Sequence, residues 1–356
     1  MAPEVSEAMK EASQFCVDIA EFQARASEII AGITGAEAGY VTSGAAAGLL
    51  LGTAACVTGL DPGKMNRLPD TSGMKNEVVI SRSHRNFYDH AIRSTGIQLI
   101  EVGIADRFSG AGVRDTEAWE SADAITDRTA AVCYGAYPHT LPILEKVVEA
   151  AHAHDVPVIV DAAAMLPPVE NLTRYVAAGA DMVSFSGGKG VMGPQSTGIL
   201  CGTRELIEAA YMNSAPHSEG IGRPAKVPKE EIAGIITALE LFVATDQDAQ
   251  RAGWREKAQT VVSGLQGIAG VTATLVEANP ELQDSHSGHA RAIIQSDTPT
   301  TGLPDDDIIA RLKEGDPPIF LGTAGPEGGI AVVPVNLRDG EAKIVADRLR
   351  GILGGG

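Results

Sequence analysis

Two short apolar segments that end near chemically useful residues constrain this chain most strongly. The first, residues 157–161, ends on Asp161, and the second, residues 181–185, leads into a Ser-Gly-Gly-Lys block at 186–189. A stretch long enough for one helix separates the two segments, as expected of consecutive strands in a parallel sheet. Because parallel strands end at the same edge of a sheet, Asp161 and Lys189 are expected to face one ligand site.

This pair of residues meets two needs of a pyridoxal phosphate (PLP) site. A primary amine is required to condense with the cofactor aldehyde, which makes Lys189 the candidate Schiff-base lysine. A carboxylate is required to hold the proton on the pyridinium nitrogen, which makes Asp161 its candidate partner. Alone, each residue is more simply explained as a surface lysine in a glycine turn or a solvated aspartate. Their occurrence together favours the cofactor site.

Apolar segments alternate with helical patterns through the first two thirds of the chain, which predicts an α/β fold. Several segments are continuous apolar runs, as expected of strands buried on both faces of a mostly parallel sheet. The predicted strands are residues 77–80, 97–102, 130–134, 157–161, 181–185 and 197–201, and the predicted helices between them are 115–126, 142–154 and 171–178. Residues 61–76 predict a polar loop, and residues 229–265 one long helix.

Three regions follow from this pattern. We expect residues 1–33 to form an N-terminal helical segment associated with the smaller domain, residues 34–228 a large PLP-binding α/β domain, and residues 229–356 a small α+β C-terminal domain. The small domain is predicted to contain strands near 271–276, 290–294, 319–321 and 329–335, and helices at 304–313 and 339–353. A chain of 356 residues can bury cores of this number and size.

The charge and the cysteines exclude several classes of partner. The net charge of −18 repels phosphate backbones and anionic membranes, so we expect neither a nucleic-acid nor a membrane partner. The four cysteines have no metal-ligand spacing, and the N-terminus has no signal-peptide pattern, so we expect a cytoplasmic protein with reduced thiols and no metal site. The sequence after Gly187 also lacks the spacing of a P-loop, which argues against an NTPase.

Other residues are placed to complete the site. Ser43, Gly44 and Ala45 precede an apolar helix with small residues in its first turn, where free N–H groups bind anions; close packing of that helix on the sheet explains the same pattern equally well. Ser184 and Ser186 lie at a strand end beside Asp161. His84 follows a strand and is positioned either to lie over a ring or to serve a structural role.

Together, these segments resemble a known family. The chain is similar to the fold-type I PLP-dependent enzymes related to bacterial selenocysteine synthase, and most similar to the tRNA-independent, D-glucosaminate-6-phosphate ammonia-lyase-like branch. The resemblance covers nearly the whole chain and is carried by residues 34–38, 43–47, 79–82, 161, 186–189, 193–198, 221–226 and 229–232. It implies a seven-stranded, mostly parallel sheet with a smaller domain, and a homodimer or a higher multiple.

The resemblance also implies roles for individual residues. Lys189 holds the cofactor and shuttles a proton, Asp161 pairs with the ring nitrogen, and His84 stacks on the ring. Ser43, Gly44, Ala45 and Ser186 hold the phosphate. Arg223 and Lys226 reach substrate anions, and Arg338 either grips the substrate carboxylate or is a solvated residue before a helix.

Two departures from the relatives bear on activity. The tRNA-binding domain of selenocysteine synthase has no counterpart here, so we do not expect that reaction. Relatives also carry a segment before the first helix, whereas this sequence begins directly before it; we expect either a late start or a site that lacks this wall.

The expected reaction is β-elimination from a 2-amino-3-hydroxy acid, a small-molecule substrate and in one form a phosphorylated amino-sugar acid, to give a 2-keto acid and ammonia. Transamination, racemisation and retro-aldol cleavage begin from the same or a related carbanion, and the sequence leaves them open. A non-catalytic α/β protein with a remnant site is the alternative from another class; the intact Lys189 and Asp161 argue against it.

Overall fold

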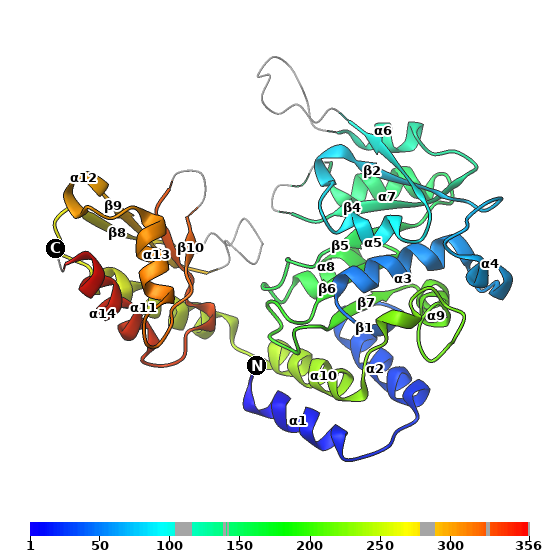
Figure 1. The fold of residues 1–356 in the computed structure, drawn as a ribbon. Helices are drawn as coiled ribbons and strands as arrows, with labels where there is room; N and C mark the ends of the chain where they lie inside the picture. The colour runs from blue at the N-terminus through cyan, green and yellow to red at the C-terminus, as the bar shows by residue number, and fades with distance from the viewer. Residues whose placement is uncertain (104–115, 138–139, 141, 278–288, 325–327, 355–356) are drawn as a thin grey trace. The chain divides into compact units, whose positions relative to one another are not determined.

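The chain forms two compact units, Met1–Ala244 and Thr245–Gly356, in a computed structural model (Figure 1). The structure describes residues 1–356 except 104–115, 138–139, 141, 278–288, 325–327 and 355–356. Helix α10 (Lys229–Ala244) belongs to the first unit, and not to the second as the sequence pattern suggested. The reason is that Ile232, Ile235 and Leu239 are fully buried in the core of the first unit.

The expected single helix over 229–265 is in fact two helices. Helix α11 (Gln247–Gly264) begins after Asp246, whose carboxylate accepts hydrogen bonds from the amides of Asp248 and Ala249. An aspartate that caps a helix in this way fixes a new helix start within an otherwise continuous helical pattern. The boundary between the two units falls at this break.

The N-terminal segment is also two helices, α1 (Pro3–Ser13) and α2 (Ile19–Thr34), which Asp18 separates by capping α2. Helix α1 packs against α10, and α2 packs against the first strand of the sheet. Both helices are therefore part of the first unit, which differs from the expected association with the smaller domain.

Seven strands form one mostly parallel sheet in the first unit, in the order β1-β7-β6-β5-β4-β2-β3. Strands β2 to β6 pair in parallel, and β7 joins antiparallel to β6 and β1. Their bounds are β1 Ala38–Thr42, β2 Glu77–Ser81, β3 Gln98–Val102, β4 Thr129–Gly135, β5 Val158–Asp161, β6 Met182–Ser186 and β7 Gly198–Gly202. The α/β fold and the six strands predicted from apolar runs are confirmed.

Helices cover both faces of this sheet, because alternate residues of each strand enter different cores. In β5, Val158 and Val160 pack with the core beneath α2, α7, α8 and α10, whereas Ile159 packs with the core beneath α3, α5 and α9. The remaining bounds are α3 Ala45–Thr58, α4 Pro62–Arg67, α5 Asp89–Arg93, α6 Ala118–Asp123, α7 Leu144–His152, α8 Asn171–Ala177 and α9 Arg204–Met212. Three-residue 3₁₀ turns span Arg82–His84 and Arg223–Ala225.

Two local predictions for the first unit differ from the structure, and in the second unit residues 319–321 are not a strand. The expected loop at 61–76 contains α4, which Asp61 caps by accepting from the amides of Gly63 and Lys64. Helix α6 is shorter than the expected 115–126, and residue 115 lies outside the described residues.

The second unit is a four-stranded antiparallel sheet, in the order β10-β11-β9-β8, with its own apolar core. Its elements are β8 Val271–Val276, β9 Arg291–Ser296, β10 Gly322–Thr323, β11 Ile330–Val332, α12 Thr298–Thr301, α13 Asp305–Lys313, a 3₁₀ turn Pro334–Asn336 and α14 Glu341–Leu353, besides α11. Among the described residues, no helix is both long enough and apolar enough to cross a membrane.

Candidate active site

The carboxyl ends of β5 and β6 bring the two key residues to one cavity. Asp161 ends β5 and lies beside Ser184 of β6 in the parallel register. The chain leaves β6 at Ser186 and turns back so that Lys189 reaches the same edge of the sheet. The resulting cavity has a volume of about 200 Å³ and is lined by Gly44, Ala45, Ala46, Leu49, Tyr88, Asp161, Ala163, Ser186 and Lys189.

The start of helix α3 forms one wall of this cavity. Gly44 precedes the helix with a φ of +89°, a conformation that glycine adopts without strain. Among the described residues, no side chain caps this helix start, so the amides of its first turn remain available to a ligand. Free amides and the positive end of the helix dipole together favour an anion at this wall.

The loop that carries Lys189 is held by close backbone contacts. A Cβ on Gly188 would lie 2.6 Å from Cα of Gln195, and one on Gly190 would lie 2.0 Å from the carbonyl oxygen of Leu166. No side chain fits at either distance, so glycine is required on both sides of the lysine. The loop therefore presents the exposed side chain of Lys189 from a tightly packed backbone.

Asp161 is partly buried at the end of β5. Its Oδ1 accepts a hydrogen bond from the amide of Ala163 at 3.1 Å. Burial raises the pKa of Asp161, and the Ala163 amide, the charge of Lys189 and a hydrogen bond from the side chain of Asn86 offset this shift only in part. A carboxyl group that is costly to ionise gains most from a cationic partner, such as a protonated ring nitrogen.

Tyr88 occupies a position that we expected for His84. The Lys189 Nζ lies 6.0 Å from the centroid of the Tyr88 ring, and Tyr88 lines the cavity. His84 is only 3% exposed; its ring packs edge-on against Tyr134, and its Nδ1 accepts from the amide of Gly135 at 3.3 Å.

His84 lines a separate space of about 10 Å³, which also borders Leu49 and Asp161. A space of this size holds at most one water molecule, and the stacking of His84 on a ring stays a prediction. The sequence signal for Tyr88 was an aromatic residue in the loop after β2.

Two serines that we expected at the cofactor, Ser43 of the phosphate cradle and Ser184 at the strand end, have partners within the protein. Ser43 Oγ donates to the carbonyl oxygen of Ala225 at 2.9 Å. Ser184 is fully buried, and its Oγ donates to the carbonyl oxygen of Ala45 at 3.0 Å. Neither serine is among the residues that line the cavity, whereas Gly44, Ala45 and Ser186 are.

The predicted substrate-binding cations lie in different units. The Ser43–Ala225 hydrogen bond ties the turn Arg223–Ala225 to the residue before the cavity wall. Arg223 is half-buried and Lys226 is exposed, and neither has an ion-pair partner among the described residues. Arg338 is an exposed residue of the second unit, and its contact with substrate stays a prediction.

Comparisons with known proteins agree with this geometry. The family model described as aminotransferase class-V matches residues 108–287. A D-glucosaminate-6-phosphate ammonia lyase from Salmonella typhimurium is 31% identical over 99% of this chain and 91% of its own length. The chain belongs to the aminotransferase class-V family.

Three further proteins are similar to this chain. A solved D-glucosaminate-6-phosphate ammonia-lyase superimposes with a TM-score of 0.84 at 30% identity, over 100% of this chain and 92% of that one. A 5'-C-glycyluridine monooxygenase-decarboxylase from a Streptomyces species is 32% identical over 89% of this chain and 76% of its own. An L-seryl-tRNA(Sec) selenium transferase from Actinobacillus pleuropneumoniae is 32% identical over 51% of this chain and 39% of its own.

As a member of the aminotransferase class-V family, the protein is an enzyme, and its cofactor is PLP. The residues of the cavity fit this cofactor: an uncapped helix start suits a phosphate, and a buried carboxylate suits a protonated ring nitrogen. Lys189 supplies the amine that binds the cofactor aldehyde.

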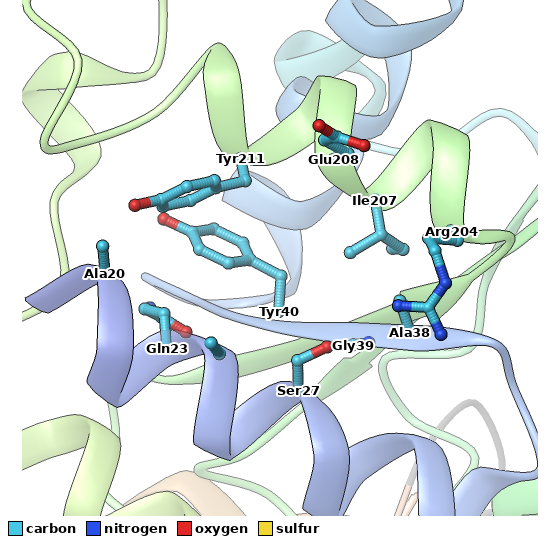
Figure 2. Close-up of a pocket in the computed structure, with 11 residues that line it drawn as sticks. Ala20, Gln23, Ser27, Ala38, Gly39, Tyr40, Arg204, Ile207, Glu208 and Tyr211 are labelled. Atoms are coloured by element: carbon cyan, nitrogen blue, oxygen red, sulfur yellow. Dashed lines mark hydrogen bonds between the residues drawn. The ribbon is translucent and has the colours of Figure 1, made fainter.

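A second cavity, of about 230 Å³, lies over the outer edge of β1 between α2 and α9 (Figure 2). Its floor includes Tyr40, whose hydroxyl donates to Ser214 Oγ at 2.9 Å. Burial raises the pKa of Tyr40 to about 12, so this hydroxyl stays protonated at neutral pH. This cavity contains none of the predicted site residues.

The same region protects the free edge of the sheet. Gln23 accepts from the amide of Val41 at 3.2 Å and donates to its carbonyl oxygen at 3.0 Å. Ser27 Oγ accepts from the amide of Gly39 at 2.9 Å. These side chains take the place of a neighbouring strand, which is how an edge strand avoids pairing with another chain.

We expect Gln23→Leu to loosen this edge measurably. The substitution leaves the buried N–H and C=O of Val41 without partners, at about 1–3 kcal/mol for each group. Hydrogen exchange at the amides of β1 should become at least roughly tenfold faster, as read by mass spectrometry of the peptide that contains Val41. Glu28→Gln, on the exposed face of α2, is the control; equal exchange in the two variants would contradict this role.

Proposed function

We propose that this enzyme is a PLP-dependent ammonia-lyase that acts on a 2-amino-3-hydroxy acid, specifically a phosphorylated amino-sugar acid. The observation that carries the proposal is the single cavity that joins Lys189, Asp161 and the uncapped start of α3. The full-length similarity to a D-glucosaminate-6-phosphate ammonia lyase supports this reaction among those that such a cavity permits.

The chain's own groups divide the chemical work. Bound PLP supplies an electron sink that stabilises negative charge at the substrate Cα. Lys189 Nζ, once free of the cofactor, takes the proton from Cα, and because Lys189 lines the cavity the same group can deliver a proton to the leaving hydroxyl. The carboxylate of Asp161 holds a proton at the ring nitrogen, and the amides of Ala45 and Ala46 hold the phosphate.

The overall reaction balances without an added oxidant or reductant. The Cα–H and Cβ–O bonds break, and water leaves. The resulting enamine takes up a proton and is hydrolysed to a 2-keto acid and ammonia. One water is released and one is consumed, so the net change is loss of ammonia from the substrate.

Two cations are candidates for a second anionic group on the substrate. Arg223 and Lys226 lie in or next to the turn that is hydrogen-bonded to Ser43, so their backbone is adjacent to the cavity wall. Neither cation has an ion-pair partner within the part of the chain that the structure describes, which is notable at a net charge of −18, and a substrate phosphate is an anion that they would attract. Arg338 is retained as the candidate for the substrate carboxylate.

The proposal is tested by product analysis with PLP and D-glucosaminate 6-phosphate. We expect equal amounts of ammonia and a 2-keto acid, and much less product from D-glucosaminate, which lacks the phosphate. Arg223→Gln and Lys226→Gln should each raise KM for the phosphorylated substrate far more than for the unphosphorylated one. Product formation without ammonia would contradict the proposed reaction.

A second reaction is favoured by a specific observation, the 32% identity to a monooxygenase-decarboxylase. That reaction would consume oxygen and release carbon dioxide. Measuring dissolved oxygen and carbon dioxide in the same incubations separates the two reactions. Unchanged oxygen with ammonia release supports the lyase reaction, whereas oxygen-dependent release of carbon dioxide supports the monooxygenase-decarboxylase reaction.

We also infer that the enzyme acts in the cytoplasm as a homodimer whose interface borders the cavity. Phe87 is 96% exposed and Tyr88 is 58% exposed, an unusual concentration of exposed aromatic surface beside a ligand site. A second copy is the partner that the family resemblance implies.

Phe87→Asp should therefore convert the dimer to a monomer and lower kcat, because each cavity would lose the surface that covers it. Analytical ultracentrifugation measures the mass. The exposed residue Phe15 of the first unit provides the control Phe15→Asp, which should leave the dimer intact. A wild-type enzyme that sediments as a monomer would contradict this inference.

A further inference from the structure

Helix α3 lies directly on strand β6, with glycines at the points of contact. A Cβ on Gly48 would lie 2.4 Å from Ser184 Oγ, whereas one on Gly52 would lie 3.4 Å from Met182 Sδ. The four residues from Gly48 to Gly52 advance the helix by about 6 Å, and the two residues between Met182 and Ser184 advance the strand by about 7 Å. The two elements therefore stay in register along their contact. Ser184 therefore lies two residues beyond Met182 on the same face of β6, nearer to the cavity.

Ser184 is the polar contact between this strand and the first turn of the helix. Its side chain is 0% exposed, and its Oγ donates to the carbonyl oxygen of Ala45, the first residue of α3, at 3.0 Å. Strand β7 supports the same turn from below, because a Cβ on Gly198 would lie 2.5 Å from the carbonyl carbon of Gly44.

We propose that Ser184 is a positioning residue that sets the height and direction of the α3 start, and thereby the affinity for the cofactor phosphate. The proposal rests on the assignment of the cavity as the PLP site. Ser184 does not line the cavity, so it acts through the amides of Ala45 and Ala46. Hydrogen bonds weaken steeply as distance and angle depart from their preferred values, so a small tilt of the first turn weakens the grip on an anion.

This role predicts a loss of affinity that depends on the phosphate. PLP and pyridoxal share the ring and the aldehyde, and only PLP has the phosphate. A variant that displaces the α3 start should bind PLP less tightly and bind pyridoxal as before. General damage to the fold would weaken both ligands equally.

The experiment measures dissociation constants for PLP and for pyridoxal on the cofactor-free full-length enzyme. Ser184→Ala should weaken PLP about tenfold, as for one buried hydrogen bond, and change pyridoxal binding less than about twofold. Gly48→Ala should have a similar effect, because its Cβ pushes the hydroxyl of Ser184 out of its hydrogen bond. Gly52→Ala is the matched control and should leave both constants within about twofold, because its Cβ meets a flexible methionine at an ordinary distance.

The double variant Ser184→Ala/Gly48→Ala makes the test specific. Both single changes break one contact, and removing the hydroxyl makes room for the new Cβ, so the double variant should bind PLP no worse than Gly48→Ala alone. If one single variant fails to fold, the other still tests the proposal, with the circular dichroism spectrum as the check.

Three results would overturn the proposal: unchanged PLP affinity in Ser184→Ala, equal losses for PLP and pyridoxal, or fully additive effects in the double variant. A wild-type enzyme that binds no PLP would instead refute the cofactor site itself, and that outcome is distinguishable because the wild type is measured first.

Discussion

Lys189→Ala should lower the rate of ammonia release by roughly 10³-fold or more, the largest effect expected for any single substitution in this chain. The variant loses the amine that holds the cofactor and also the base that moves the Cα proton, and a positioned base alone contributes roughly 10²–10⁴-fold. No other lysine or arginine among the described residues lines the cavity, so no neighbour replaces it.

Two readouts separate these functions of Lys189. The visible absorption band of lysine-bound cofactor, and its loss on borohydride reduction, should be absent from the variant. Added methylamine should restore part of the rate, because a free amine can take the place of the missing base.

Lys189→Arg keeps the positive charge but cannot supply a neutral amine, and should be equally inactive. Lys64→Ala, on the exposed helix α4, is the control and should retain wild-type activity. A Lys189→Ala variant with more than a tenth of wild-type activity would exclude this residue as the catalytic amine.

Asp161→Asn should lower kcat roughly 10²-fold or more, with folding unimpaired. The amide accepts the hydrogen bond from Ala163 as the carboxylate does, but it carries no charge to hold a proton at the ring nitrogen. The dissociation constant for PLP should also rise, which titration of the cofactor-free protein measures. Asp123→Asn, at the exposed end of α6, is the matched control, and equal activity of the two variants would contradict the role of Asp161.

The same substitution should stabilise the cofactor-free protein at neutral pH. Burial raises the pKa of Asp161 above that of an aspartate in the unfolded chain, so the folded state favours the protonated carboxyl. Stability attached to this group is therefore present at low pH and lost as the pH rises through the folded pKa.

Thermal unfolding of the cofactor-free proteins tests this sign. Asp161→Asn should melt at a higher temperature than wild type at pH 7, and the difference should shrink as the pH falls toward the ordinary aspartate range. A lower melting temperature for the variant at pH 7 would show that the carboxylate is stabilised by its surroundings. A gain in stability together with a loss of activity is the pattern of a site whose charge serves the reaction.

The sequence determined the parts of this protein that depend on local pattern. Apolar segments of four to six residues, several of them continuous, predicted six strands of the mostly parallel sheet, because strands buried on both faces have no polar side. The polar residues that end these runs predicted the position of the site, because parallel strands end at a common edge. Asp161 and Lys189 were both found in this way, and the structure places them at one cavity.

Only the tertiary structure decided which neighbours reach that cavity. Tyr88 lines it and His84 does not, because the His84 ring is buried against Tyr134 whereas Tyr88, four residues later, lies at the cavity. Ser184 and Ser186 share one face of β6, yet α3 covers the first and leaves the second open. The helix breaks also depend on tertiary packing: Asp18 and Asp246 interrupt long helical patterns because each caps the start of a new helix, α2 and α11. Periodicity reports which face of an element is apolar, but the direction of a loop side chain is set by contacts with residues far away in the sequence.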